Sequence, residues 1–248
     1  MRQILPGYPI LQSMVLLGSF SLSLPLHAHV SVASSPAMAN ERAIVELSIP
    51  HGCTVDDVHL DTARVEVLVP ESLTGLRPVF GALGNAHIET IATATGSSTR
   101  LIWEKPADTV LDDDTHYYSV KFRAQMPDAP FTQIALPTIQ YCLNGDEEVS
   151  VAWDQAPAGG HDHNSSDTGG NPAPILMVYP TRHAGWNQYS TVVDQHLHDM
   201  SILDDAEIVW WNGAAYSSNP TIKAMIETDS SVTPLSEIHD GATFWVKY

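Results

Sequence analysis

A histidine stands directly behind a segment that resembles an export leader. Residues 23–32 read SLPLHAHVSV, and cleavage after Ala28 would make His29 the first residue of the mature chain. Its α-amino nitrogen and imidazole Nδ1 would then close a six-membered chelate ring on one metal ion. Such nitrogen donors favour Cu(II), which heads the affinity order of divalent first-row metals. Because an α-amino group has a pKa of about 7.7–8.0, binding there releases a proton and weakens in acid. The alternative is that cleavage leaves a histidine first by chance.

The leader has the composition of a signal peptide. Residues 1–28 carry one charge, Arg2, ahead of an apolar run, and Leu26-x-Ala28 supplies a small-residue cleavage pattern. A retained membrane anchor is the alternative, but Pro25 and several serines break the run short of about 20 apolar residues. We therefore expect an exported chain in the periplasm or cell envelope, with no membrane span after cleavage.

Other side chains with metal-binding chemistry lie farther along the chain. His161, Asp162 and His163 form an H-D-H sequence within a segment rich in Gly, Ser and Asp, which predicts a weak secondary metal site or a solvated spacer. His51 is expected to be a turn residue with a satisfied hydrogen bond. The sequence HLHDM at residues 196–200 is expected to be a surface loop.

The chain contains two cysteines, Cys53 and Cys142. In an oxidising compartment an isolated pair most often forms a disulfide, which here would close a loop of about 90 residues. The alternative is a thiolate metal site, which the absence of a C-x-x-C spacing disfavours.

Charge and motifs exclude several classes of function. The formal net charge of −18 repels nucleic acids and anionic lipid surfaces and favours cations. The sequence lacks a P-loop, a dinucleotide fingerprint, a G-x-S-x-G motif and an H-E-x-x-H motif, so we expect a protein that is not an enzyme. The acidic run at residues 112–114 is expected to be a solvated turn.

Alternating hydrophobicity indicates an all-β chain. In residues 62–70, TARVEVLVP, the side chains of Ala63, Val65, Val67 and Val69 share one face. The same period recurs through Tyr118, Val120 and Phe122 and through Val149, Val151 and Trp153. Short strands bounded by prolines predict an immunoglobulin-like β-sandwich over residues 29–157, with a closed barrel as the alternative.

The remaining residues divide into a linker and a second module. Residues 158–174 are rich in Gly, Asp, Ser and Pro and predict a flexible linker. Residues 175–248 predict a small β-rich domain with four of the six tryptophans: Trp186, Trp210, Trp211 and Trp245. We expect these rings to form its core. The alternative is a surface that stacks on sugar rings.

A run of motifs in the first domain resembles the YcnI-like family of exported copper-binding proteins. The motifs are HVSV at 29–32, ELSIPHGC at 46–53, RVEVLVPESL at 64–73, LIW at 101–103, YYSVKFRAQMPDAP at 117–130, LPTIQYC at 136–142 and VSVAW at 149–153. The resemblance implies a single-histidine brace for Cu(II) at His29, completed by a carboxylate and a tryptophan. The tryptophan matches Trp153 best and Trp103 second. The chain has Pro36 near the family's acidic position, so Glu41 or Glu46 is the expected carboxylate.

Together these observations predict a protein of copper homeostasis. It would hold Cu(II) for storage, buffering or delivery, and its partners would be the copper ion and other copper-handling proteins of the envelope. A copper-dependent oxidase is one alternative, although known chemistry of that kind uses two histidines in the brace. An adhesion or glycan-binding protein that acts through the C-terminal module is another.

Overall fold

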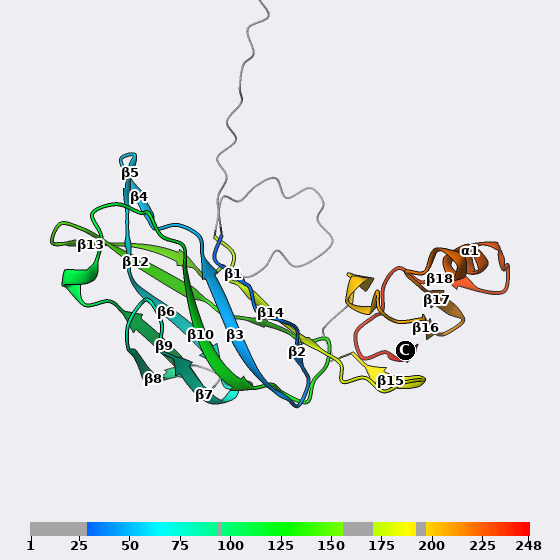
Figure 1. The fold of residues 1–248 in the computed structure, drawn as a ribbon. Helices are drawn as coiled ribbons and strands as arrows, with labels where there is room; N and C mark the ends of the chain where they lie inside the picture. The colour runs from blue at the N-terminus through cyan, green and yellow to red at the C-terminus, as the bar shows by residue number, and fades with distance from the viewer. Residues whose placement is uncertain (1–28, 94–95, 156–170, 192–196) are drawn as a thin grey trace, which may run out of the picture.

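Two β-sheets facing each other form the first domain of the computed structural model, which describes residues 29–93, 96–155, 171–191 and 197–248 (Figure 1). The first sheet has the order β1 (Ser31–Val32), β3 (Arg42–Ile49), β10 (Tyr118–Gln125) and β7 (Thr74–Val79). The second has the order β13 (Glu147–Trp153), β12 (Thr138–Asn144), β6 (Thr62–Pro70), β9 (Gly96–Glu104) and β8 (Ala86–Thr93). The domain is thus the predicted all-β sandwich.

Smaller elements complete this domain. A hairpin joins β4 (Cys53–Val55) and β5 (Val58–Leu60), and a 3-10 turn covers Ala107–Thr109. A third sheet has the order β11 (Gln133–Ala135), β14 (Ile175–Tyr179) and β2 (Ala37–Met38).

The core lies between the two large sheets, where the alternating residues meet. Val65, Val67 and Val69 of β6 are fully buried, as are Val45, Leu47 and Ile49 of β3. Tyr118, Val120 and Phe122 of β10 are buried in the same cluster. The period of two in the sequence therefore predicted correctly which side chains of β6 and β10 form the core.

The boundary between the two domains differs from the prediction. Strand β14, expected to open the C-terminal module, pairs with β11 and, in parallel, with β2 of the first domain. Pro172 forms a bridge with Gln155, and Ala173 is buried. Residues 171–179 therefore belong to the sandwich, and most of the predicted linker lies outside the described residues.

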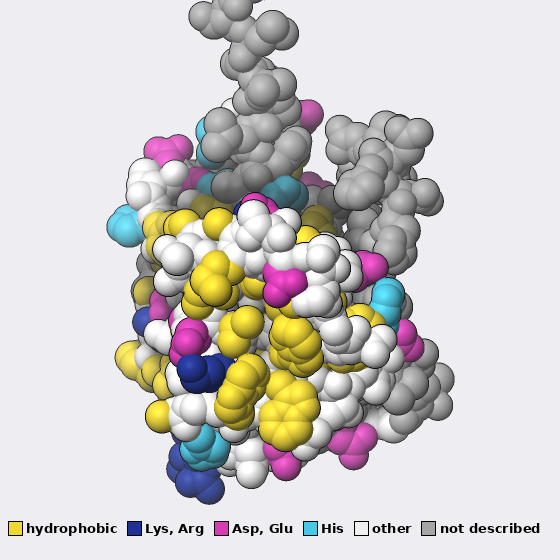
Figure 2. Space-filling view, turned by 90° about the vertical axis from the view of Figure 1, so that its right-hand side faces the viewer, with side chains coloured by type: hydrophobic (Ala, Val, Ile, Leu, Met, Phe, Trp, Pro, Cys, Tyr) yellow, Lys and Arg dark blue, Asp and Glu magenta, His cyan; other side chains and the backbone are white. Residues whose placement is uncertain are grey.

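The C-terminal module is a five-stranded sheet with one helix. Its order is β15 (Trp186–Ser190), β19 (Thr243–Lys247), β16 (Ile208–Trp211), β17 (Ala214–Tyr216) and β18 (Thr233–Pro234), with a 3-10 turn at Met200–Leu203. Helix α1 (Pro220–Thr228) was not predicted; it begins with proline after Asn219, whose side chain accepts hydrogen bonds from the N–H groups of Thr221 and Ile222. Figure 2 views the molecule from this side. It shows apolar side chains exposed among charged ones.

One side chain of the sandwich enters the core of the module. Phe131 has a positive φ of 67° and is buried, with its ring centroid 5.7 Å from that of Tyr189 and 5.4 Å from that of Phe244. The two domains are therefore in contact. Among the described residues, no helix has the length and apolarity needed to cross a membrane.

Candidate metal centre

His29 lies at the start of the first strand, at one end of the sandwich. Strand β1 runs antiparallel to β3, with Ser31 opposite Ser48 and Val32 opposite Leu47. This register, continued by two residues, places His29 opposite Pro50. Val30 is buried in the core, whereas His29 is exposed. The packing thus fixes the backbone next to His29 and leaves its imidazole accessible to solvent.

The imidazole of His29 contacts Trp153. The two ring centroids are 5.2 Å apart and the ring planes are nearly perpendicular, at 87°. Trp153 is the last residue of β13 and is 4% exposed, so it forms a rigid wall at one side of the imidazole. Its indole Nε1–H is buried without a hydrogen-bond partner in the described part of the chain. Indole N–H groups only donate, so this group cannot ligate a metal.

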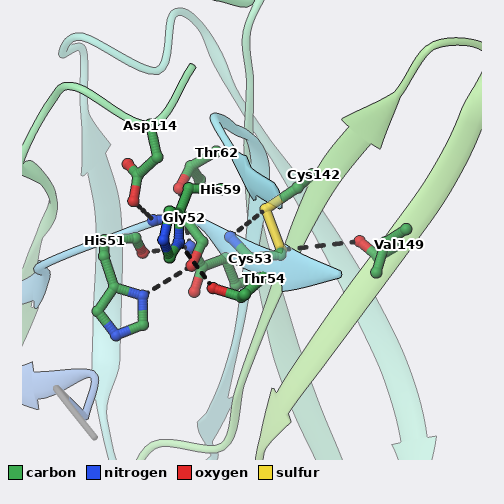
Figure 3. The surroundings of a disulfide bond; sticks show 10 residues. His51, Gly52, Cys53, Thr54, His59, Thr62, Asp114, Cys142 and Val149 are labelled. Atoms are coloured by element: carbon green, nitrogen blue, oxygen red, sulfur yellow. Dashed lines mark hydrogen bonds between the residues drawn. A yellow bond between two sulfur atoms is a disulfide. The ribbon is translucent and has the colours of Figure 1, made fainter. Parts of the chain in front are cut away.

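The PHGC segment follows β3 directly and therefore lies at the same end of the sandwich as His29. Figure 3 shows its surroundings at the disulfide. Gln140 Nε2 donates to the backbone oxygen of His51 (2.7 Å), and the N–H of Gly52 donates to Asp114 Oδ2 (2.7 Å). A Cβ at residue 52 would lie 1.7 Å from the backbone oxygen of Leu60, so only glycine fits. Asp112 and Asp113 are exposed in a bend, as expected of a solvated turn, whereas Asp114 is partly buried and holds the PHGC segment through its bond to Gly52.

The disulfide between Cys53 and Cys142 is confirmed. The described residues contain no free cysteine, which rules out the alternative of a thiolate site at these two positions. Gln140 and Cys142 lie two residues apart on β12 and therefore point to the same face of the sheet. This geometry explains the Q-x-C spacing. The side chain of Gln140 donates a hydrogen bond to the backbone of the PHGC segment, and Cys142 is bonded to Cys53 of the same segment. The disulfide links the PHGC segment to β12, and the neighbouring strand β13 carries Trp153.

His51 has the hydrogen bond expected of a turn residue. Its Nδ1 donates to the backbone oxygen of Gly52 at 2.7 Å, which leaves Nε2 as the acceptor of the ring. Ligating histidines commonly donate their second ring N–H to a carbonyl in this way. His51 follows Pro50, the residue opposite His29, and is therefore the candidate for a second nitrogen ligand that we consider.

Neither expected glutamate lies beside His29. Glu46 is opposite Ala33, four residues from His29, which is about 13 Å at about 3.3 Å per residue. Its carboxylate is 3.0 Å from Lys121 Nζ, and hydrogen bonds from Lys121 and Ser119 hold the pKa of Glu46 below its usual range. Glu41 precedes β3 at the opposite end of that strand, about 30 Å away on the same basis.

Trp103, the second choice for the tryptophan, is a core residue. It is 1% exposed and its Nε1 donates to the backbone oxygen of Val79 at 3.1 Å. Strand β9 lies three strands from β13, which is about 14 Å across the sheet. The structure therefore joins His29 with Trp153 and leaves Trp103 elsewhere in the core.

The remaining histidine sites add no described metal cluster. His161, Asp162 and His163 lie outside the described residues, as does His196. His198 Nδ1 is 3.1 Å from Glu237 Oε2 in the C-terminal module. Over the described ranges, no group of three or more His, Cys, Asp or Glu side chains is placed to hold a metal.

The donors at this end of the sandwich fit a small nitrogen site. His29 offers one imidazole, and it offers a second nitrogen if the mature chain begins there. Trp153 can shield one side of a bound ion and lower the local polarity. Because His29 is exposed, water or a donor from another molecule can reach this end of the sandwich.

Residues 29–178 match the sequence profile of the family described as a domain of unknown function, DUF1775. The chain belongs to this family. The matched region begins at His29 and ends within β14, so the DUF1775 domain includes the strand that the structure adds to the sandwich. The comparison with curated proteins gave no match.

Two solved structures resemble parts of this DUF1775 protein. One is an uncharacterized protein from Nocardia farcinica with an immunoglobulin-like fold, at 16% identity over 61% of this chain and 98% of that chain, with a TM-score of 0.43. The other comprises domains D2 and D3 of the major pilin SpaD from Corynebacterium diphtheriae, at 14% identity over 50% of this chain and 48% of that chain, with a TM-score of 0.30.

Proposed function

We propose that this DUF1775 protein is an exported copper carrier that holds Cu(II) at His29 for storage, buffering or delivery. The observation that carries the proposal is the contact between His29 and Trp153, whose ring centroids are 5.2 Å apart. The resemblance to the YcnI-like family selected these two residues from sequence motifs, and they lie 124 positions apart in the chain.

In this proposal His29 supplies both protein nitrogens. Cleavage after Ala28 frees the α-amino group, and the same residue chelates through Nδ1. Trp153 forms the wall behind the imidazole, while the exposed side admits the donor or acceptor of the metal. An exposed site with few protein ligands suits a carrier, because a partner's ligands can replace water without unfolding the domain.

A variant at His29 tests this proposal. For a chain that begins at residue 29, we expect His29→Ala to weaken Cu(II) binding about 100-fold, or about 2.7 kcal/mol, because the chelate ring is lost. Competition titration against a chromophoric chelator measures the change, and EPR reports the nitrogen ligands. His87→Ala is the matched control, since His87 is exposed on β8, four strands from β13. If His29→Ala binds copper as tightly as the control, the proposal is wrong.

A copper oxidase is the second candidate, and the orientation of His51 is the observation in its favour. An oxidase with two histidines requires His51 Nε2 as a third nitrogen, so His51→Ala should remove one nitrogen from the EPR spectrum and abolish oxygen consumption with a reductant. A carrier instead releases its copper to a chelator and consumes no oxygen.

A further inference from the structure

Three tryptophans lie on the outward face of the C-terminal sheet. Trp186, Trp245 and Trp210 belong to the adjacent strands β15, β19 and β16, and Trp210 is directly opposite Trp245. Their exposed fractions are 54%, 44% and 37%, respectively. Together with Ile208 they line an open apolar groove of about 580 Å³. We refer to these three tryptophans and Ile208 as the tryptophan face.

Strand alternation turns the rings outward and corrects the expectation that they form the core. Trp245 stands between Phe244 and Val246, which are both fully buried, and Trp210 follows the fully buried Val209. Among the four tryptophans of the module, only Trp211 packs partly against the core cluster. Contiguous exposed apolar patches of this kind are often functional.

A polar cleft adjoins the tryptophan face. Trp186 also lines a cavity of about 630 Å³ between the sandwich and the module. The exposed polar side chains at this cavity are Asp128 from the sandwich and Thr181, His183, Gln188 and Ser190 from the module. Trp186 thus joins an apolar platform to a cleft rich in hydrogen-bonding groups.

We propose that the tryptophan face and this cleft bind a neutral polysaccharide of β-1,4-linked pyranose units. The glucose and N-acetylglucosamine units of such chains carry their substituents equatorially, so each ring presents a flat C–H face that stacks on an indole, while its hydroxyl edges require hydrogen bonds. Flat indole faces and an adjoining polar cleft supply both needs in one continuous surface.

Other occupants fit the observations less well. The exposed fractions sum to about one and a third tryptophans, or about 340 Å² at about 250 Å² each, against about 800 Å² per partner in a stable protein interface. The net charge of −18 opposes binding to anionic lipids and acidic polymers. A neutral glycan avoids this repulsion and needs only a small area.

Retention on insoluble polysaccharides tests the proposal. The chain beginning at residue 29 is mixed, in the presence of EDTA, with microcrystalline cellulose in one arm and chitin in the other. We expect retention on at least one, and about ten-fold weaker binding or more for Trp186→Ala and for Trp245→Ala, because each loses a stacking surface. Phe80→Ala is the matched control, since Phe80 is 75% exposed on the sandwich. Gln188→Ala tests the contribution of the cleft.

Each outcome decides the proposal. Retention on cellulose identifies glucose units as the ligand, and retention on chitin identifies N-acetylglucosamine units. The His29→Ala variant should bind polysaccharide normally, which separates this proposal from the copper site. Thermal unfolding checks that the tryptophan variants fold. The proposal is overturned if neither polysaccharide retains the protein, or if folded tryptophan variants are retained like Phe80→Ala. A dimer in sedimentation that only these variants dissociate would make the face an interface between copies.

Discussion

Replacing both cysteines by alanine is expected to lower the free energy of unfolding by about 4–5 kcal/mol. The bridge joins residues separated by 89 positions, and in the chain-entropy model a closed loop of that size restricts the unfolded chain by this amount. The effect should be large because the bridge also fixes the PHGC segment, where Gly52 and Gln140 make partly buried hydrogen bonds. Urea unfolding of the double variant Cys53→Ala/Cys142→Ala measures the difference.

Reduction of the unchanged protein is the matched control for this prediction. Unfolding in the presence of a thiol reductant should show a destabilisation of the same size, because it opens the loop without altering side-chain volume. A loss below about 1 kcal/mol in both experiments would show that the PHGC segment is held by its hydrogen bonds alone.

Replacing Lys105 by methionine is expected to destabilise the sandwich by about 3–5 kcal/mol, because it leaves a buried carboxylate without its partner. Lys105 Nζ is 2.5 Å from Asp61 Oδ2 and 2.7 Å from the Tyr118 hydroxyl, and the side chains of the ion pair are 4% and 0% exposed. Burial of Tyr118, together with a hydrogen bond to Asp61 and its charge, raises the pKa of this tyrosine well above its usual value. Urea unfolding again provides the measurement.

Two further variants distinguish the contribution of this buried ion pair to the free energy of unfolding from that of a surface ion pair. Glu148→Gln removes the partly exposed pair between Glu148 and Arg64, whose atoms are 2.8 Å apart, and should cost less than about 1 kcal/mol. The double variant Lys105→Met/Asp61→Leu should recover much of the loss, because it removes both buried charges. Equal effects of Lys105→Met and Glu148→Gln would contradict the account.

The sandwich could be predicted because its strands follow a simple rule. A strand with one face in the core alternates apolar and polar residues; β10 shows this pattern without interruption, and β6 shows it except at Leu68. The disulfide was equally predictable, because a chain that is expected to be exported and has two cysteines has one possible pairing within the chain. The contact of Trp153 with His29 was expected only through family resemblance, since Val149, Val151 and Trp153 otherwise read as a core face.

Other features depend on strand pairings that cannot be read from a single sequence. Strand β14 follows a segment rich in glycine and proline, so its return to β2 and β11 has no local signature. The tryptophans of the module alternate with buried residues, but a continuous run such as IVWW conceals which of them face outward. The distance from Glu41 and Glu46 to His29 depends on the register between β1 and β3, which cannot be predicted from the sequence.

In the proposed copper site the α-amino group of His29 is a metal ligand. The most direct measurement is a Cu(II) titration followed by EPR on two purified forms, one beginning at His29 and one with a single additional alanine before it. We expect the added residue to weaken binding about 100-fold and to remove one nitrogen from the spectrum, because His29 then carries an amide in place of an amine. Equal affinities and identical spectra in the two forms would contradict this expectation and place the copper at other side chains.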